Sequence, residues 1–310
     1  LGVQLEEFPE DYEHVTSPCL PKKGQGTKPL DHRLLAVFSA IYRVEMGSWF
    51  KILYKWFVPC LHPDLHGAVP GHEAAEVSWD AQADLEHALI NMLKEILLMV
   101  DYYKFFDSFD HAWVRDFLLM LGFPKAFAKM VYKMYVNLKR YIKLGAAYGD
   151  AFIGYNGMGQ GDVATLIPAL AMVSGQFFMV SLHFPRIRKG ACIDDRNFLG
   201  SFNDITRMYP LIAAYDRAAG HFIQPEKTSI AATDAQDQLA LKNVQIDGLL
   251  PKIKTTDALT GDIVTTSRRK LCTRANNKML KACDMAHWLN SAPVSRRTKL
   301  RAATTAIILA

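Results

Sequence analysis

The chain has 310 residues, of which half are apolar and 22% are charged, and its net charge is +5. This ordinary globular composition excludes a disordered tail, a collagen-like fibre and a disulfide-rich miniprotein. The positive charge is unevenly distributed, because the stretch from Lys252 to Ala310 holds twelve Lys or Arg against three Asp or Glu. A basic C-terminal segment on a slightly acidic body predicts a local contact with nucleic acid or a membrane.

The five cysteines are few, odd in number and widely spaced. This usage is typical of an intracellular reducing compartment, nuclear or cytoplasmic, and not of a disulfide framework. The chain begins at Leu1 and ends in Ala-Ile-Ile-Leu-Ala, so we expect it to be part of a longer protein.

Hydrophobic periodicity and Pro/Gly punctuation predict the elements of the first half of the chain. They are extended segments over 12–32, a helix over 33–58, a loop over 60–71, a helix over 73–94, a buried strand over 96–100, and helices over 109–121 and 124–142. The same signals predict a loop over 151–161, a helix over 163–182, a hairpin with an acidic turn around 191–201, a helix over 204–219, a turn and strand over 222–231, and basic helix over the last 45 residues.

The segment 163–185 carries no Lys, Arg, Asp or Glu and is long enough to span a bilayer. It also contains Thr165, Ser174, Gln176 and His183, and Lys or Arg flank it on one side only. These features favour a buried helix over a membrane span.

Three carboxylates follow or interrupt short apolar runs: Asp101 ends the predicted strand over 96–100, and Asp194 and Asp195 lie in the predicted hairpin. Carboxylates at one sheet edge suit hard ions such as Mg²⁺, and two such ions support in-line phosphoryl transfer. The alternative is purely structural, with Asp101 as a helix N-cap and the Asp pair as turn residues.

The context of these residues resembles reverse transcriptases, in particular those of non-LTR retrotransposons and group II introns. The segment Asp101-Tyr-Tyr-Lys-Phe-Phe106-Asp-Ser-Phe-Asp-His111 resembles motif A, and Gly157-Met-Gly-Gln160-Gly161-Asp162 resembles motif B. Cys192-Ile-Asp194-Asp195 resembles motif C, and Ala219-Gly-His-Phe-Ile-Gln-Pro-Glu-Lys227-Thr228 resembles motif D. Upstream, the segments 21–24 and 33–42 resemble the fingers that precede motif A, so the resemblance covers about residues 15–230.

The chain departs from the family pattern at several positions. Gly159 stands where motif B usually has Arg, and Cys192-Ile193 stands where motif C usually has Tyr-Ala. Arg196 and Asn197 follow the Asp pair where apolar strand is expected, and Gln224 replaces the usual Asn of motif D. None of these departures removes a metal ligand.

The resemblance implies an α+β right-hand polymerase: fingers over 1–95, a palm of antiparallel sheet with packed helices over 96–245, and a partial helical thumb over 246–310. It implies RNA-directed DNA synthesis from dNTPs on an RNA template with a DNA primer, and no membrane. The implied catalytic residues are Asp101, Asp194, Asp195 and Lys227. The three aspartates would hold two Mg²⁺ ions, with Mn²⁺ as a substitute, and Lys227 would protonate the departing pyrophosphate.

The resemblance also implies binding residues. Phe106 would lie under the sugar and exclude a 2′-hydroxyl, Gln160 and Gly161 would border the new base pair, and the backbone of Tyr102 and Tyr103 would meet the triphosphate. Arg33 and Lys23 would clamp the triphosphate. The predicted phosphate contacts to template and primer are Arg268, Arg269, Lys270, Arg274 and Lys278.

Two alternatives stay open at this point. The chain is either an active enzyme or a catalytically degenerate, polymerase-derived domain that binds nucleic acid. Separately, the chain has a cluster of residue types that bind zinc: Cys60, His62, His66 and His72. Their spacing fits no usual zinc finger, and prolines interrupt it. The spacing therefore argues against zinc. The oligomeric state leaves no sequence signal.

Overall fold

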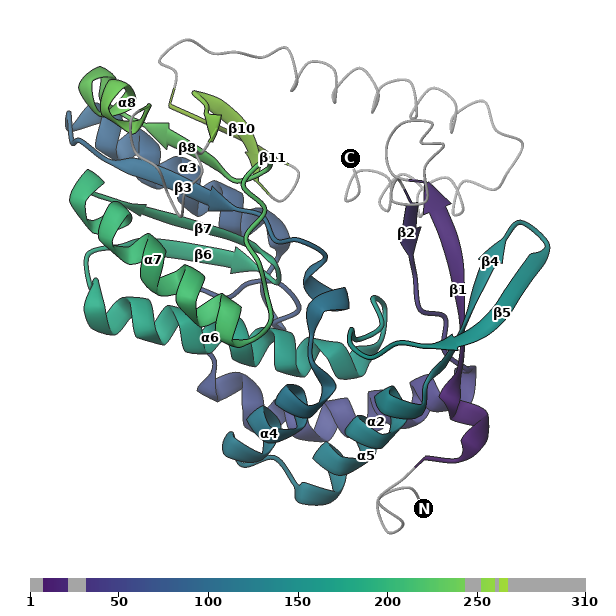
Figure 1. Ribbon diagram of the computed structural model, residues 1–310. Coiled ribbons are helices and arrows are strands. Elements are labelled where there is room, and N and C mark those ends of the chain that lie inside the picture. The colour runs from purple at the N-terminus through teal and green to yellow at the C-terminus, as the bar shows by residue number, and fades with distance from the viewer. Residues whose placement is uncertain (1–7, 22–31, 243–251, 260–261, 267–310) are drawn as a thin grey trace, which may run out of the picture.

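The computed structural model describes residues 8–21, 32–242, 252–259 and 262–266 (Figure 1). These residues form a five-stranded sheet, a four-stranded sheet and a separate hairpin. The strands are β1 His14–Pro21, β2 His32–Leu34, β3 Ile96–Val100, β4 Lys139–Leu144, β5 Ala147–Ile153, β6 Arg188–Cys192, β7 Asp195–Gly200, β8 Ser229–Ala232, β9 Lys252–Ile253, β10 Thr256–Leu259 and β11 Asp262–Thr265. The α-helices are α2 Ala40–Phe57, α3 Ala74–Ile90, α4 His111–Met120, α5 Lys125–Asn137, α6 Leu166–His183, α7 Phe202–Ala218 and α8 Ala235–Leu241.

Strand β3 lies at the centre of the five-stranded sheet, whose order is β6-β7-β3-β8-β9. All five of its residues are buried, and alternate side chains point to opposite faces of the sheet. Leu97 and Met99 pack with α3 and the β10–β11 hairpin, whereas Ile96, Leu98 and Val100 join the larger core. Figure 1 shows α6 and α7 covering this second face. The sequence prediction of a buried central strand is confirmed.

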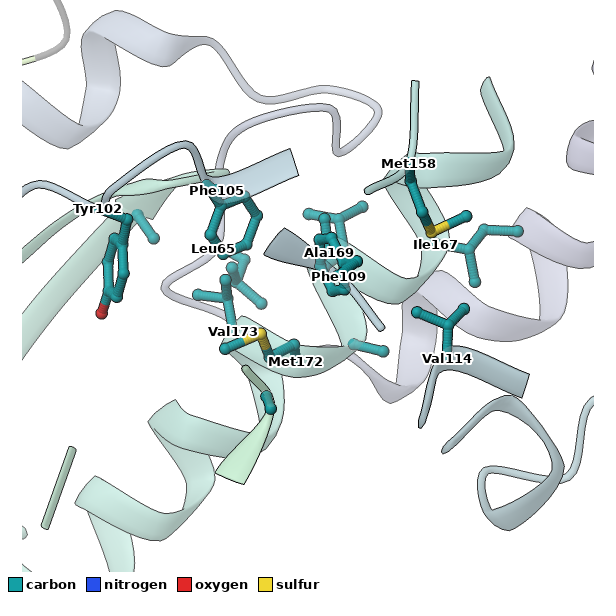
Figure 2. Close-up of a cluster of buried hydrophobic side chains, with 14 of the residues drawn as sticks. Leu65, Tyr102, Phe105, Phe109, Val114, Met158, Ile167, Ala169, Met172 and Val173 are labelled. Carbon is teal, nitrogen blue, oxygen red and sulfur yellow. The ribbon is translucent and has the colours of Figure 1, made fainter. Parts of the chain in front are cut away.

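Helix α6 is the main helix of the core. With the preceding turn it is long and apolar enough for a membrane span, yet 72% of its most apolar window is buried within the protein. In Figure 2, Met172 and Val173 of α6 lie among Leu65, from the loop before α3, and Phe105 and Phe109, from the turn after β3. The prediction of a buried helix here is confirmed.

The four-stranded sheet joins distant parts of the chain, in the order β2-β1-β4-β5. Strand β1 pairs in parallel with β4, so residues on both sides of the predicted boundary at residue 95 share one sheet. The helix predicted over 124–142 therefore ends at Asn137, because residues 139–144 are strand. The loop predicted over 151–161 is likewise partly strand, since β5 extends over Ala147–Ile153. Pairing with β1 outweighs the local helical pattern.

Two further predicted segments differ from the structure. The helix predicted over 33–58 begins only at Ala40, because residues 32–34 pair with β1 and the Ser39 hydroxyl caps the helix by accepting from the Tyr42 N–H at 3.2 Å. Within the predicted thumb, residues 252–266 form strands: β9 extends the five-stranded sheet in parallel with β8, and β10–β11 packs on α3. The fold is mixed α and β, as predicted, while the division at 1–95, 96–245 and 246–310 stays a prediction.

Candidate active site

Two adjacent strands, β3 and β7 (Figure 1), bring the aspartates of the predicted motifs A and C to one edge of the sheet. Strands β3 and β7 are antiparallel, and the pairing ends at Val100 with Arg196. Asp101 therefore follows β3 at the edge where Asp195 opens β7. The β6–β7 hairpin closes on the Cys192–Asp195 pair, which leaves Ile193 and Asp194 in the turn. The predicted hairpin with an acidic turn is confirmed.

The turn itself is strained. Ile193 has a φ of +58°, a left-handed conformation that a β-branched side chain rarely adopts. Strain of this kind persists only where the surrounding packing fixes the backbone. A close approach from the loop over 61–73 supplies that packing, because a Cβ added at Gly67 would lie 2.8 Å from the Ile193 nitrogen and from the Cys192 Cα.

The carboxylates at this edge repel one another. Burial, followed by the charges of Asp194 and Asp101, raises the pKa of Asp195 to about 6, against the opposing charges of Lys227 and Arg33. Burial also raises the pKa of Asp194, with Asp101 adding to the rise and Arg196 and Arg33 opposing it. Exposed Arg33 on β2 is thus close enough to act on both carboxylates.

Lys227 lies in the same site. Its Nζ is 3.4 Å from Oδ1 of Asp101, and both side chains are partly exposed. A pocket of about 340 Å³ opens beside this pair, lined among others by Asp195, Lys252 and Lys254. The pocket thus combines carboxylates with three lysines.

The predicted motif B lies against the turn that follows Asp101. The Gly157 N–H donates to the Phe109 carbonyl at 2.7 Å, and the Met158 N–H donates to the Phe106 carbonyl at 2.8 Å. Gly157 has a φ of +87°, and a Cβ there would lie 2.7 Å from the carbonyl oxygen of Asp107. Only glycine allows this approach. Phe106 is held half-buried beside motif B.

Gln160 connects motif B to the segment before α2, because its carbonyl accepts from the Ala36 N–H at 3.0 Å. Gly161 beside it is exposed with a φ of +107°. Gly159 has no room for a side chain, since a Cβ there would lie 2.7 Å from the Cβ of Ala36. Close packing against Ala36 therefore explains why this chain has glycine at the motif B position that usually holds Arg.

Asp162 completes motif B as a buried structural residue. It accepts from the Tyr42 hydroxyl at 2.9 Å and from the Tyr135 hydroxyl, and it caps the next turn by accepting from the Ala164 N–H at 3.2 Å. Burial raises its pKa despite these hydrogen bonds. Asp162 thereby ties α2 and α5 to the start of α6.

The two tyrosines after Asp101 have partners within the protein, and the predicted contact of their backbone with a triphosphate stays a prediction. The Tyr103 N–H donates to the Phe222 carbonyl at 2.9 Å, so this donor is occupied within the protein. Tyr102 is buried, and its hydroxyl donates to Asp216 at 2.8 Å. Lys23 and the basic residues Arg268, Arg269, Lys270, Arg274 and Lys278 lie outside the described residues.

Sequence reasoning missed a buried polar network directly behind the site. The Arg196 guanidinium, fully buried, donates from Nη1 to Oδ1 of Asp216 at 2.9 Å, to Oε1 of Gln176 at 2.7 Å and to the Tyr102 hydroxyl at 2.7 Å. Its carbon Cζ lies 4.2 Å from the centre of the Tyr102 ring. The network joins β7 to α6, α7 and the turn after β3. The available signal was Arg196, which stands in the sequence where apolar strand is expected after the Asp pair.

The carboxylate set has the chemistry for Mg²⁺, a hard cation that prefers oxygen ligands. Burial is the main cause of the raised pKa values of Asp194 and Asp195, and the neighbouring carboxylates add to the rise. The ligand oxygens of the three aspartates do not all lie within 4.8 Å of one another; among the described residues that criterion is met by His66, His72 and Glu76 instead. Asp101, Asp194 and Asp195 fit a cation that would draw them together.

No protein-family model matches the chain, and no curated protein matches its sequence. Solved structures of telomerase do match. Telomerase from Candida tropicalis with the TWJ fragment of telomeric RNA has a TM-score of 0.56 at 13% identity, over 96% of this chain and 52% of that one. Telomerase from Candida albicans with the TWJ fragment has a TM-score of 0.55 at 10% identity, over 90% and 52% of the two chains.

The apo telomerase of Candida tropicalis gives a similar result, with a TM-score of 0.53 at 13% identity over 96% of this chain and 57% of that one. The chain spans about half the length of these telomerases. The fold is therefore reverse-transcriptase-like. The likeness concerns the fold alone, and the assignment of a function depends on the residues of the site.

Proposed function

We propose that this chain is the polymerase core of an RNA-directed DNA polymerase of the non-LTR retrotransposon or group II intron type. One observation carries the proposal: Asp101 follows β3 at the edge where the β6–β7 turn presents Asp194 and Asp195. The reverse-transcriptase-like fold supports it, as does the order of the four motifs along the chain.

In this proposal Asp101, Asp194 and Asp195 hold two Mg²⁺ ions. Bound there, the ions would lower the pKa of the primer 3′-hydroxyl and neutralise charge on the α-phosphate. Lys227, with its Nζ 3.4 Å from Oδ1 of Asp101, would protonate the departing pyrophosphate. Arg33 and the pocket lysines Lys252 and Lys254 supply positive charge for the triphosphate.

Other residues of the chain set the position and identity of the nucleotide. The Phe106 ring, fixed by motif B, would exclude a 2′-hydroxyl, and exposed Gly161 beside Gln160 would let the backbone approach the new base pair. The basic residues from Arg268 to Lys278 would contact the phosphates of an RNA template and DNA primer.

Primer extension tests the proposal. A DNA primer annealed to an RNA template is incubated with the chain, dNTPs and Mg²⁺, and Asp194→Ala is compared with Asp116→Ala, which removes a surface carboxylate on α4. We expect extension in the wild type and Asp116→Ala, and none in Asp194→Ala. Extension that survives Asp194→Ala would contradict the assigned site.

A second candidate function is a degenerate domain that binds nucleic acid without extending it. The separation of the three carboxylates in this structure, together with Cys192 and Ile193 in motif C, favours it. The same assay decides between the two. Retention of the primer–template by the wild type, with no extension in Mg²⁺ or Mn²⁺, would support the degenerate binder and overturn the polymerase.

A further inference from the structure

The loop over 61–73 and the first turns of α3 bring two histidines and a glutamate together. Nδ1 of His66 lies 2.9 Å from Oε2 of Glu76, and Nδ1 of His72 lies 2.8 Å from the same oxygen. The rings of His66 and His72 are nearly perpendicular, with centres 5.0 Å apart. Among the described residues, this is the set of His, Cys, Asp and Glu whose ligand atoms all lie within 4.8 Å of one another.

The spacing of these atoms is close to that of a tetrahedral metal site. Ligand bonds of about 2.0–2.1 Å to zinc place neighbouring ligand atoms roughly 3.3 Å apart. The observed separations of 2.8 and 2.9 Å need to open by only a few tenths of an ångström. The His66 side chain is 12% exposed, Glu76 32% and His72 40%, so solvent reaches the site and water can supply a fourth ligand.

A carboxylate also faces the other ring nitrogen of His66. Its other ring nitrogen, Nε2, lies 3.9 Å from Oδ2 of Asp80, one helical turn beyond Glu76. A carboxylate at the far nitrogen of a ligating histidine orients the ring and increases its basicity.

We propose that His66, His72 and Glu76 bind one Zn²⁺ ion, separate from the aspartates at the end of β3. Two imidazole nitrogens and one carboxylate oxygen suit zinc and disfavour Mg²⁺, which prefers oxygen ligands alone. The linear spacing of the histidines hid this site, because Glu76 comes from the following helix.

The position of the site gives the ion a structural role. The His66 N–H donates to the carbonyl of Ala191 at 2.9 Å, and Leu65 forms a parallel bridge with the same residue. Gly67 packs against Cys192 and Ile193. An ion that fixes this loop to α3 therefore also supports the β6–β7 turn that carries Asp194, from the side opposite the Arg196 network.

Zinc binding is measured on the full 310-residue chain. The protein is stripped with chelator, returned to millimolar Mg²⁺ so that the aspartates are occupied, and titrated with Zn²⁺ against a chromophoric competitor. We expect one Zn²⁺ per chain and a higher melting temperature with Zn²⁺. Since neither readout involves DNA synthesis, the result stands apart from the proposed polymerase activity. A wild-type chain that binds no Zn²⁺ in this assay would overturn the proposal.

Three variants test the ligands. Glu76→Gln keeps an oxygen that accepts hydrogen bonds from both histidines, so it preserves the cluster while removing the charged ligand; His72→Ala removes a ligand outright. Both should lose the stoichiometric binding and the thermal shift. Asp80→Asn should weaken binding less than either, because the Asp80 carboxylate is 73% exposed and lies 3.9 Å from His66 Nε2.

The matched control is His87→Ala, on the exposed side of the same helix, where His87 contacts Asn91. It should bind Zn²⁺ as the wild type does. If Glu76→Gln and His72→Ala bind as tightly as the wild type, the ion is held elsewhere and the proposed site is wrong. If His87→Ala alone loses binding, the same conclusion follows.

Discussion

Nη1 of Arg196 lies 2.9 Å from Oδ1 of Asp216, and both side chains are fully buried, at 0% and 1% exposure. The two residues come from β7 and α7. Their ion pair therefore joins β7, which begins with Asp195, to one of the two helices that cover this face of the five-stranded sheet. A buried pair of this kind contributes little when compared with an apolar pair, but breaking it is costly, because one charge is left without a partner.

Arg196→Met should therefore destabilise the protein by about 3–5 kcal/mol, since it leaves Asp216 charged and buried. The double variant Arg196→Met/Asp216→Leu should recover part of this loss, because it removes the unpaired charge but leaves the buried Tyr102 hydroxyl and Gln176 amide without these partners. Urea unfolding followed by circular dichroism measures both. Arg115→Met is the control, because Arg115 pairs with Asp116 at the surface and the expected cost is below about 1 kcal/mol. A double variant as unstable as the single one would show that packing, and not charge, dominates.

Local sequence signals predicted the strand and hairpin that carry the aspartates better than they predicted the elements and residues that pack around them. Strand β3 and the acidic hairpin were predictable because their apolar runs and turn residues are local signals. Strand β4 was predicted as helix because its pairing with β1 joins residues about 125 positions apart, which no local pattern encodes. The partner of Arg196 and the convergence of His66 with Glu76 depend on tertiary packing for the same reason.

Phe106→Ala should relax the choice of sugar in the proposed polymerase. The ring is held half-buried by the hydrogen bond between its carbonyl and the Met158 N–H, so its removal opens space without freeing the backbone. The ratio of ribonucleotide to deoxynucleotide incorporation, measured in single-nucleotide extension, should rise by about 10-fold or more. Tyr103→Ala, which removes an exposed neighbouring ring, is the control. An unchanged ratio in Phe106→Ala would remove Phe106 from the nucleotide site.

Gly159→Ala should destabilise the protein by about 1–3 kcal/mol, because the new methyl group would overlap Ala36 and crowd the Phe38 ring. The control is Gly47→Ala, in the interior of α2 with no atom within 4 Å of the added Cβ. It should stabilise the protein by about 0.5–1 kcal/mol, as alanine does relative to glycine in a helix. Thermal unfolding compares the two. Equal effects would show that the packing around Gly159 yields easily.

Asp195→Asn should stabilise the metal-free protein, and the gain should depend on pH. The folded pKa of about 6 lies above the ordinary value of about 3.9, so between these values the folded chain binds more protons than the unfolded chain. The stabilisation that protonated Asp195 contributes is therefore complete below about pH 4 and is lost as pH rises through about 6. Asparagine does not ionise, so the stability of the variant does not fall for this reason.

The melting temperature of Asp195→Asn, measured with chelator, should therefore exceed that of the wild type by more at pH 7.5 than at pH 4.5. Added Mg²⁺ should narrow the gap at pH 7.5, because it stabilises the wild-type carboxylates and not the variant amide. Asp150→Asn, which removes an exposed carboxylate on β5, is the control for a general effect of charge. A gap that is the same at both pH values would show that neither burial nor the neighbouring carboxylates raise the pKa of Asp195. The close approach of Asp101 and Asp194 to Asp195, on which the proposed metal site depends, would then lose this support.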